Sequence, residues 1–301
     1  MKYLFYPGCS MDASALEYKA ATLAVLQDLG AEVVELEDWT CCGASVAAVM
    51  SDLLGLVLPA RNLALAEQAC QEGETCDMLV GCSACYANFR HTILAAENPA
   101  TLGKINQALE VEGLIYRGKM QTRHLLDVLA NDFGPEEIAA RVKRPLTDLV
   151  VAPYYGCQTV RPFAPYDDGQ HPHSMEALLE ALGATVYNHS HEASCCGTAL
   201  LTTKPDVGVS MVGEILDAAS PADCLAAVCP MCHLNLDSYQ DKVSKSLGRT
   251  IKQPVFFLPQ LIGLAFGLPD SALLLKRHLV SVQPVLDKLG LKPVPGRLVT
   301  V

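Results

Sequence analysis

Long apolar runs and an excess of basic residues are both missing from this chain of 301 residues. No apolar run reaches the ~18–20 residues that a membrane-spanning helix needs. The longest candidate, residues 44–60, is interrupted by Ser51-Asp52, Gly55 and Pro59. The net charge is −11, which argues against nucleic acid as a partner because nucleic acids select basic surfaces. We therefore expect neither a membrane span nor a nucleic-acid interface.

The start of the chain has few features of an export signal. Residues 1–9 contain one cation and only five apolar residues before Pro7, which favours a short strand over a signal peptide. We therefore expect a cytoplasmic protein, and cytoplasmic cysteines are more often metal ligands or redox groups than structural disulfides. Charged residues are also few, at 18% against 50% apolar residues, which indicates a globular fold with a large core.

Cysteine, in contrast, is abundant, with 13 in the chain. Ten of them form two copies of one pattern, in which a single cysteine is followed by Cys-Cys-Gly and then by Cys-x-x-Cys. The first copy is Cys9, Cys41, Cys42, Cys82 and Cys85, and the second is Cys157, Cys195, Cys196, Cys229 and Cys232. Thiolates gathered in fives exceed what packing requires, and iron binds thiolates that converge from several segments. The pattern therefore indicates two iron–sulfur sites.

Five cysteines per site separate this pattern from the common metal sites. An ordinary cubane cluster and a structural zinc site each take four protein ligands, and the C-x2-C-x2-C-x3-C-P run of bacterial ferredoxins is absent. Two alternatives to a five-cysteine cluster stay open from the residues alone. One is a four-cysteine cluster with a spare cysteine for redox chemistry, and the other is zinc or free thiols.

The duplication extends beyond the cysteines, since residues 29–34 match residues 182–187. Each repeat alternates strands with helices, which predicts an α/β fold of two tandem repeats related by a pseudo-twofold axis. Each repeat should be a small parallel sheet flanked by helices. We expect the first repeat and a helical connection within residues 1–145, and the second repeat with its C-terminal tail within residues 146–301.

The expected elements follow from the hydrophobic periodicity. Strands are predicted at residues 2–6, 32–36 and 78–80, and again at 148–153, 184–187, 225–228 and 255–258. Helices are predicted at residues 13–29, 59–72 and from 82 onwards, then at 174–182, 207–219 and 232–247, with a mostly helical connection over 102–145. In parallel sheets of this kind every cysteine group follows the C-terminal end of a strand, which is the edge where ligands bind.

The duplicated Cys-Cys-Gly pattern and its surroundings resemble the B subunit of heterodisulfide reductase and its relatives. The local matches are Tyr155-Gly-Cys157-Gln158, Ser194-Cys-Cys-Gly197 and Cys229-Pro-Met-Cys-His-Leu-Asn-Leu236. The resemblance spans both repeats. It implies two noncubane [4Fe–4S] clusters, one on each set of five cysteines, and all ten positions are filled.

The resemblance also implies a function. In the family the two clusters face each other and cleave a disulfide held between them, which for the founding members is the mixed disulfide of coenzyme M and coenzyme B. The chain would then be the disulfide-reducing component of such a complex, and its partners would be the family's ferredoxin-like (C) and flavin (A) subunits. Relatives in fumarate reductase, succinate dehydrogenase E-type, lactate or glycolate oxidation and sulfur-oxidation complexes leave a second function open, electron transfer to or from a quinone or flavoprotein. A thiol or zinc scaffold without an electron role is the third.

Two histidines lie just before Cys195 and are candidate proton donors. His189 and His191 have the right side chain to protonate a departing thiolate, because the pKa of histidine is near neutrality, although a solvent-facing loop position is the simpler explanation. We expect His233 on a helix beside the second cluster. Three other histidines are expected to be ordinary helix residues: His91, His124 and His278.

Three cations follow the cysteine motifs by a few residues. Arg90, Arg161 and Lys204 would be able to bind a carboxylate, phosphate or sulfonate of the substrate. Solvated surface cations are the simpler explanation for each.

Overall fold

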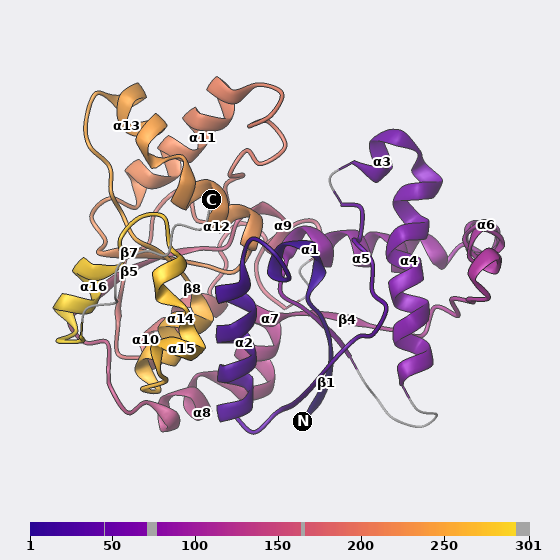
Figure 1. Ribbon diagram of the computed structural model, residues 1–301, viewed down its shortest axis with the longest axis horizontal. Helices are drawn as coiled ribbons and strands as arrows, with labels where there is room; N and C mark the ends of the chain where they lie inside the picture. The colour runs from indigo at the N-terminus through magenta and orange to yellow at the C-terminus, as the bar shows by residue number, and fades with distance from the viewer. Residues whose placement is uncertain (45, 71–76, 164–165, 293–301) are drawn as a thin grey trace.

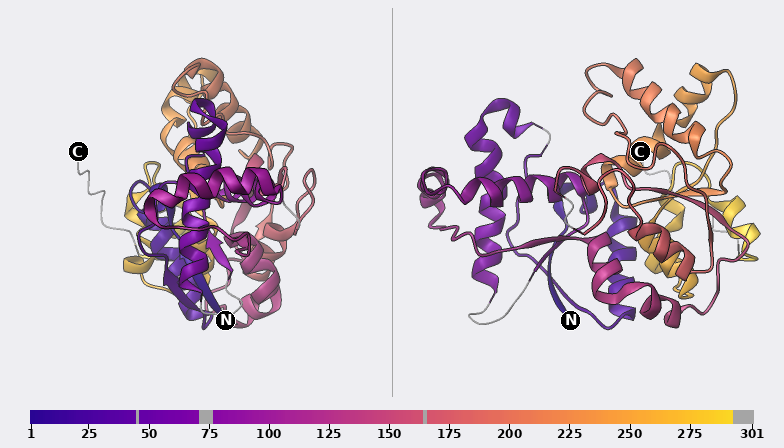
Figure 2. Two further views of the ribbon diagram at one scale, coloured as in Figure 1. Left: turned by 90° about the vertical axis from the view of Figure 1, so that its right-hand side faces the viewer. Right: turned by 180° about the vertical axis from the view of Figure 1, so that it is seen from behind.

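The computed structural model describes residues 1–44, 46–70, 77–163 and 166–292. It contains two four-stranded parallel sheets flanked by helices, one in each half of the chain (Figures 1 and 2). The strand order is β2-β1-β3-β4 in the first sheet and β6-β5-β7-β8 in the second. The two orders correspond position by position, so the predicted α/β fold of two tandem repeats is confirmed.

The elements have the following bounds. The strands are β1 (Lys2–Tyr6), β2 (Glu32–Glu35), β3 (Met78–Val80), β4 (Thr122–His124), β5 (Val150–Tyr154), β6 (Thr185–Val186), β7 (Cys224–Ala227) and β8 (Val255–Phe257). The helices of the first half and the connection are α1 (Gly8–Met11), α2 (Leu16–Asp28), α3 (Ala47–Met50), α4 (Asp52–Ala69), α5 (Ser83–Ala96), α6 (Pro99–Leu109), η1 (Glu110–Glu112), α7 (Leu125–Asp127), η2 (Val128–Phe133) and α8 (Gly134–Arg141). Those of the second half are α9 (Cys157–Val160), α10 (Ser174–Ala181), α11 (Pro205–Ala218), α12 (Pro230–Ser238), α13 (Gln240–Leu247), α14 (Leu258–Ala265), α15 (Asp270–Leu273), η3 (Leu275–Arg277) and α16 (Gln283–Lys288).

Successive strand residues point into two different cores. In β1, Phe5 packs in the same core as α2, whereas Tyr6 packs with residues of α4 and α5 in the other. In β7, Ala226 packs in the same core as Phe5, and Ala227 packs in the same core as Tyr6. Strands that are covered on both faces read as continuous apolar runs, as expected for a parallel sheet.

Each half also packs its helices against the other half. Helix α2 lies against α14 and α15 (Figure 1). Helix α10 lies against η2 and α8. The short helices that carry the single cysteines also contact the opposite half: α1 contacts α12, and α9 contacts α5. These reciprocal contacts place the C-terminal edges of the two sheets next to each other.

Helix α4 corrects one predicted boundary. The sequence predicts a helix from Pro59, but α4 begins at Asp52, where Ser51 caps it by accepting a hydrogen bond from the Leu54 amide at 3.4 Å. Pro59 lies buried inside the helix, where the lost backbone bond and ring clash cost about 3 kcal/mol. Packing of α4 against α5 and α6, with Ala60, Leu63 and Ala64 in the core that also contains strand residues Tyr6 and Met78, offsets that cost.

Two further differences concern elements that the sequence signals weakly. Strand β4 pairs with β3 and completes the first sheet, but its three polar residues are too few to show a period. The prediction of a mostly helical connection over 102–145 therefore holds for α6 to α8 and misses β4. Residues 232–247 are not one helix, because Tyr239 leaves helical geometry between α12 and α13. Among the described helices, none combines the length and apolar character needed to cross a bilayer.

Candidate functional site

The first five cysteines converge at the C-terminal edge of the first sheet. Cys9 lies in α1 just after β1, the Cys41-Cys42 pair follows β2, and Cys82 is the N-cap of α5 after β3. The sulfurs of Cys9 and Cys41 are 3.8 Å apart, and those of Cys42 and Cys85 are 3.2 Å apart. Cys82 and Cys85 interact as well. The five thiols therefore form one continuous set.

The second set repeats this arrangement at the edge of the second sheet. Cys157 interacts with Cys195, and Cys232 interacts with both Cys196 and Cys229. Burial follows the same order in both halves. Cys9, Cys41 and Cys195 are exposed and Cys157 is half-buried, whereas Cys42, Cys82, Cys85, Cys196, Cys229 and Cys232 are buried. Each set thus combines solvent-accessible and buried thiols.

The two sets of sulfurs meet at the boundary between the halves. The thiols of Cys82 and Cys229 interact directly, and each shifts the pKa of the other. Ser83, from the first half, is a further hydrogen-bond partner of Cys229. Its Oγ also lies 2.6 Å from Oγ1 of Thr159 in the second half. The structure therefore brings the two sets of predicted cysteines into contact through Cys82 and Cys229.

Tyr18 spans this boundary from helix α2. Its hydroxyl lies 3.0 Å from the carbonyl oxygens of both Gly81 and Val228, the residues just before Cys82 and Cys229. The ring is fully buried and stacks on Phe257, with centroids 4.1 Å apart. One side chain thus ties together the two segments that carry the Cys-x-x-Cys motifs.

Removing this hydroxyl should destabilise the protein. We expect Tyr18→Phe to keep the stack on Phe257 but to lower the free energy of unfolding by about 1–2 kcal/mol, because the two buried carbonyls lose the one O–H donor that they share. Chemical denaturation measures this change. Tyr187→Phe is the matched control, because the Tyr187 hydroxyl has no hydrogen-bond partner among the described residues. Equal unfolding free energies for the two variants would contradict the bridging role.

Two buried tyrosines position the Cys-Cys-Gly turns in equivalent ways. Tyr6, at the end of β1, donates a hydrogen bond to the Thr40 carbonyl at 2.8 Å. Tyr154, at the end of β5, donates to the Ser194 carbonyl at 2.7 Å. Thr40 and Ser194 directly precede the two cysteine pairs. Burial, reinforced by nearby thiols, raises the pKa of both tyrosines, so both remain protonated donors.

Two asparagines, which were not predicted from the sequence, support the same turns. Asn88 Nδ2 donates to the Cys42 carbonyl at 2.6 Å, and Asn235 Nδ2 donates to the Cys196 carbonyl at 3.3 Å. Each lies three residues after the second cysteine of a Cys-x-x-Cys motif. The signal was therefore present as a shared C-x-x-C-x-x-N pattern in both repeats.

Hydrogen bonds between thiols favour anionic sulfur in both sets. Hydrogen bonds with Cys41 and then Cys85 lower the pKa of Cys42 to about 4, although burial opposes this shift. A bond from Cys157 lowers the pKa of Cys195 to about 6. The same bonds raise the pKa of the partner thiols Cys41 and Cys157. The thiolate is the form that binds iron, so these donor sets fit an iron–sulfur group.

The Cys-x-x-Cys motifs add two helix N-termini to the sites. Cys82 precedes the first turn of α5, and Cys229 precedes that of α12. The Cys85 and Cys232 amides donate to the Cys82 and Cys229 sulfurs, respectively. Free amides and the positive end of the helix dipole stabilise anionic sulfur at such positions.

The two candidate proton donors have different surroundings. His191 Nδ1 lies 3.1 Å from Oγ of Ser194, the neighbour of Cys195. The Nε2 atom of His189 lies 3.0 Å from the Pro153 carbonyl, and burial lowers the pKa of its ring. Of the two, His191 contacts the segment that holds the second cysteine pair.

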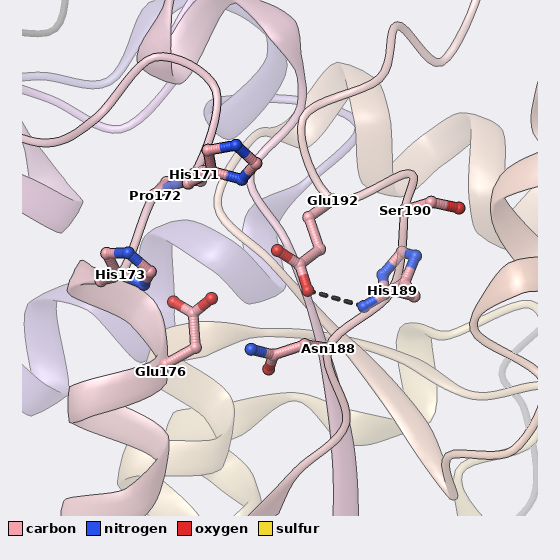
Figure 3. Close-up of a pocket in the computed structure, with 8 residues that line it drawn as sticks. All are labelled: His171, Pro172, His173, Glu176, Asn188, His189, Ser190 and Glu192. Carbon is pink, nitrogen blue, oxygen red and sulfur yellow. Dashed lines mark hydrogen bonds between the residues drawn. The ribbon is translucent and has the colours of Figure 1, made fainter.

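His189 instead borders a cavity of about 270 Å³ beside α10 (Figure 3). The lining residues are His171, Pro172, His173, Glu176, Asn188, His189, Ser190 and Glu192. Figure 3 shows the Glu176 carboxylate directed into the space between His173 and Glu192. Burial raises the pKa of Glu176 to about 7. No cysteine is among the lining residues, so this cavity is separate from the sulfur sites.

The three candidate cations are not gathered at one place. Arg90 donates to Oε1 of Gln121 at 3.3 Å, at the start of β4 and away from the cysteine edge. Arg161 donates to the Ala193 carbonyl, two residues before Cys195. Lys204 is exposed just before α11, and its ammonium has no partner among the described residues. Only the latter two lie on segments next to the second cysteine pair.

Two of the histidines expected on helices lie elsewhere. His124 ends strand β4, caps α7 through Nδ1, and has Nε2 3.3 Å from Ser83 Oγ. Burial lowers its pKa to about 4. His278 follows η3 and is buried. His91 on α5 and His233 on α12 occupy helices as predicted.

Known proteins share both repeats of this chain. The family model of the CCG cysteine-rich domain matches residues 3–90 and 151–237, which include all ten cysteines. Among solved structures, a hypothetical protein from Helicobacter pylori superposes with a TM-score of 0.75 over 93% of this chain, at 18% identity. The chain spans 52% of that protein, and this likeness supports the fold alone.

Curated relatives match over nearly the whole length. The chain is 34% identical to the 8-methylmenaquinol:fumarate reductase membrane anchor subunit of Wolinella succinogenes, over 96% of this chain and 99% of that protein. It is 29% identical to the B subunit of the ferredoxin:CoB-CoM heterodisulfide reductase of Methanosarcina mazei, over 96% and 97%. It is also 29% identical to a protein of Archaeoglobus profundus that is named as similar to the heterodisulfide reductase B subunit, over 89% and 91%. The chain therefore belongs to the CCG cysteine-rich domain family, which includes the B subunit of heterodisulfide reductase.

Proposed function

We propose that this chain is the iron–sulfur subunit of a heterodisulfide-reductase-type complex that reduces a disulfide to two thiols. One observation carries the proposal: two five-sulfur sets adjoin through Cys82 and Cys229. Disulfide reduction needs two electrons and two protons. Two adjacent one-electron sites at a single boundary suit that requirement, and the relatives named after the heterodisulfide reductase B subunit support it.

The ten cysteines would hold two noncubane [4Fe–4S] clusters. One set is Cys9, Cys41, Cys42, Cys82 and Cys85, and the other is Cys157, Cys195, Cys196, Cys229 and Cys232. When bound, these groups would supply single electrons at low cost in structural change. The donor chemistry supports this assignment, because thiols in both sets have lowered pKa values and lie at strand ends and helix N-termini.

The protein's own side chains would orient the substrate and move its protons. The exposed Cys9, Cys41 and Cys195 mark the open side of the sites, through which a small disulfide would enter. His191, next to Ser194, is the better placed of the two candidate proton donors. Lys204 would bind an anionic group of the substrate. Arg161 is committed to backbone carbonyls and would hold the loop before Cys195 in place.

Electrons would reach the sites from partner proteins of the complex. We propose a ferredoxin-like (C) partner served by a flavin (A) partner, with coenzyme M–coenzyme B heterodisulfide or a related thiol disulfide as the acceptor. The name of the Methanosarcina mazei relative includes ferredoxin and the CoB-CoM heterodisulfide. The sequence of this chain itself has no flavin or ferredoxin motif.

A second candidate function is electron exchange with a quinone or flavoprotein partner. The relative with 34% identity is named as a component of a menaquinol:fumarate reductase. An apolar tip also follows the first Cys-Cys-Gly turn, at α3 and its N-cap residue, where Val46, Val49 and Met50 are 60%, 85% and 74% exposed. An electron carrier that docked there would approach the first sulfur set.

The two functions can be separated on anaerobically purified protein. Iron and acid-labile sulfide should each approach ~8 atoms per chain for two four-iron clusters. The reduced protein should then be mixed with candidate disulfides or with a soluble menaquinone analogue in single-turnover experiments. Two thiols formed per chain would support disulfide reduction, whereas reoxidation by the quinone alone would replace it with the second function. A colourless protein without iron would remove both.

A further inference from the structure

Three buried side chains of metal-ligand type meet outside the ten cysteines. His233 and Asp237 lie one helical turn apart on α12, and His278 follows η3. They are 4%, 4% and 5% exposed, respectively. One ligand atom of each lies within 4.8 Å of the other two. The proposed disulfide chemistry uses none of these residues.

Both imidazoles are anchored through one ring nitrogen. His233 Nε2 lies 2.8 Å from the Val255 carbonyl, and His278 Nε2 lies 3.1 Å from Gln260 Oε1. Metal-binding histidines donate their second N–H to such oxygens, which fixes the tautomer and the ring orientation. His278 Nδ1 is buried and has no hydrogen-bond partner among the described residues. Leaving a buried nitrogen unpaired is energetically unfavourable, and a bound cation would remove that penalty.

The carboxylate is held in the same manner. Asp237 Oδ2 accepts a hydrogen bond from the Leu279 amide at 2.6 Å, and Oδ1 accepts one from the Val280 amide at 2.9 Å. Hydrogen bonds of this kind orient ligating carboxylates. They also connect α12 to the segment that carries His278, so all three candidate ligands are fixed relative to one another.

We propose that His233, Asp237 and His278 bind one divalent ion of the zinc class. Zinc takes imidazole nitrogen and carboxylate oxygen at about 2.0–2.2 Å, which places tetrahedral ligands roughly 3.5 Å apart. The three ligand atoms, within 4.8 Å of one another, would have to close by about an ångström. The two rings lie 5.2 Å apart, centroid to centroid, at 66°, so they approach from different directions. A water molecule would complete the tetrahedron.

The ion would have a structural role. The ligands are buried, so the site has little access for a substrate. Helix α12 starts just after Cys229 and carries Cys232, while His278 belongs to the C-terminal part of the chain. A zinc ion at this place would therefore fasten the helix of the second sulfur set to the segment after η3. The proposal stands on these residues alone and does not depend on iron at the cysteines.

Metal analysis of three proteins grown with added zinc tests the proposal. We expect about one zinc per chain in the wild type and in the control His91→Gln, an exposed histidine on α5. His278→Gln should lose that zinc while its iron content stays equal to that of the other two. The separate counts keep this test distinct from the iron–sulfur proposal. Equal zinc in the wild type and His278→Gln would overturn the site.

A measurement on the wild type alone covers the case in which His278→Gln fails to fold. Zinc-edge X-ray absorption of the purified protein should show a shell of nitrogen and oxygen ligands at about 2.0–2.1 Å. A purely sulfur shell, at about 2.3 Å, or the absence of zinc would overturn the proposal.

Discussion

Cys42→Ala is expected to remove about half of the bound iron and to lower the rate of disulfide reduction at least a hundredfold, a change of about 3 kcal/mol in the barrier. Cys42 is buried, and hydrogen bonds with Cys41 and Cys85 lower its pKa to about 4. Its sulfur lies 3.2 Å from that of Cys85. Alanine would remove the central thiol of the first set. Because both electrons are needed to cleave a disulfide, one intact site would not suffice.

The equivalent change in the second half is Cys196→Ala, with the same expected result. Iron content and single-turnover thiol release measure both variants. Cys224→Ala is the control, since Cys224 is buried in β7 outside the sulfur sets; it should keep its iron and its rate. Full activity in Cys42→Ala or Cys196→Ala would eliminate the two-site mechanism.

Gly156→Ala should damage the second site through its backbone. Gly156 has φ 72° and ψ 169°, a region that only glycine occupies without strain of about 1–3 kcal/mol. A Cβ there would lie 2.9 Å from the Cys232 sulfur. The thiol must then shift out of its set, so we expect the iron content to fall by about half and the free energy of unfolding to fall by more than the backbone strain alone.

Gly134→Ala provides a matched control for this change. Gly134 has φ 77° and ψ 165°, and a Cβ at this position would meet nothing within 4 Å. The two variants therefore share the backbone strain and differ in the contact with sulfur. Denaturation and iron analysis should show a similar loss of stability in Gly134→Ala but full iron. Equal iron content in both variants would show that the contact with Cys232 is unimportant.

Much of the fold could be read from the sequence because the repeat is strict. Strands β1, β3 and β7 are apolar and covered on both faces, and turn glycines follow helices α2 and α10. The positions of these strands and helices were therefore predicted within a few residues. Strand β4 was not predicted, because three polar residues are too few to show a hydrophobic period. It forms a strand because it pairs with the free edge of β3. The start of α4 was predicted too late, because proline is common at the first turn of a helix and Pro59 therefore indicates such a position. The residue that caps the helix, Ser51, lies eight positions earlier.

The candidate site divides in a similar way. The ten cysteines were found because the same five spacings occur twice, and the asparagines Asn88 and Asn235 could have been found by extending that comparison. Ser83 and His124 could not have been found in this way, because the equivalent positions of the second repeat hold residues of other types. Their contact with each other, at 3.3 Å, depends on how β4 and α5 pack within the first half. The contact of Ser83 with Cys229 arises only when the two halves pack together.

The order of residues along the chain determined the repeat, the fold class and which thiols belong to which set, since spacing and periodicity are local properties. Only the tertiary structure decided that the two sets touch, that Tyr18 reaches both, and that His233, Asp237 and His278 converge. The physical reason is that these contacts join segments more than forty and up to 210 residues apart, and their distances are set by how the two halves bury their apolar faces against each other.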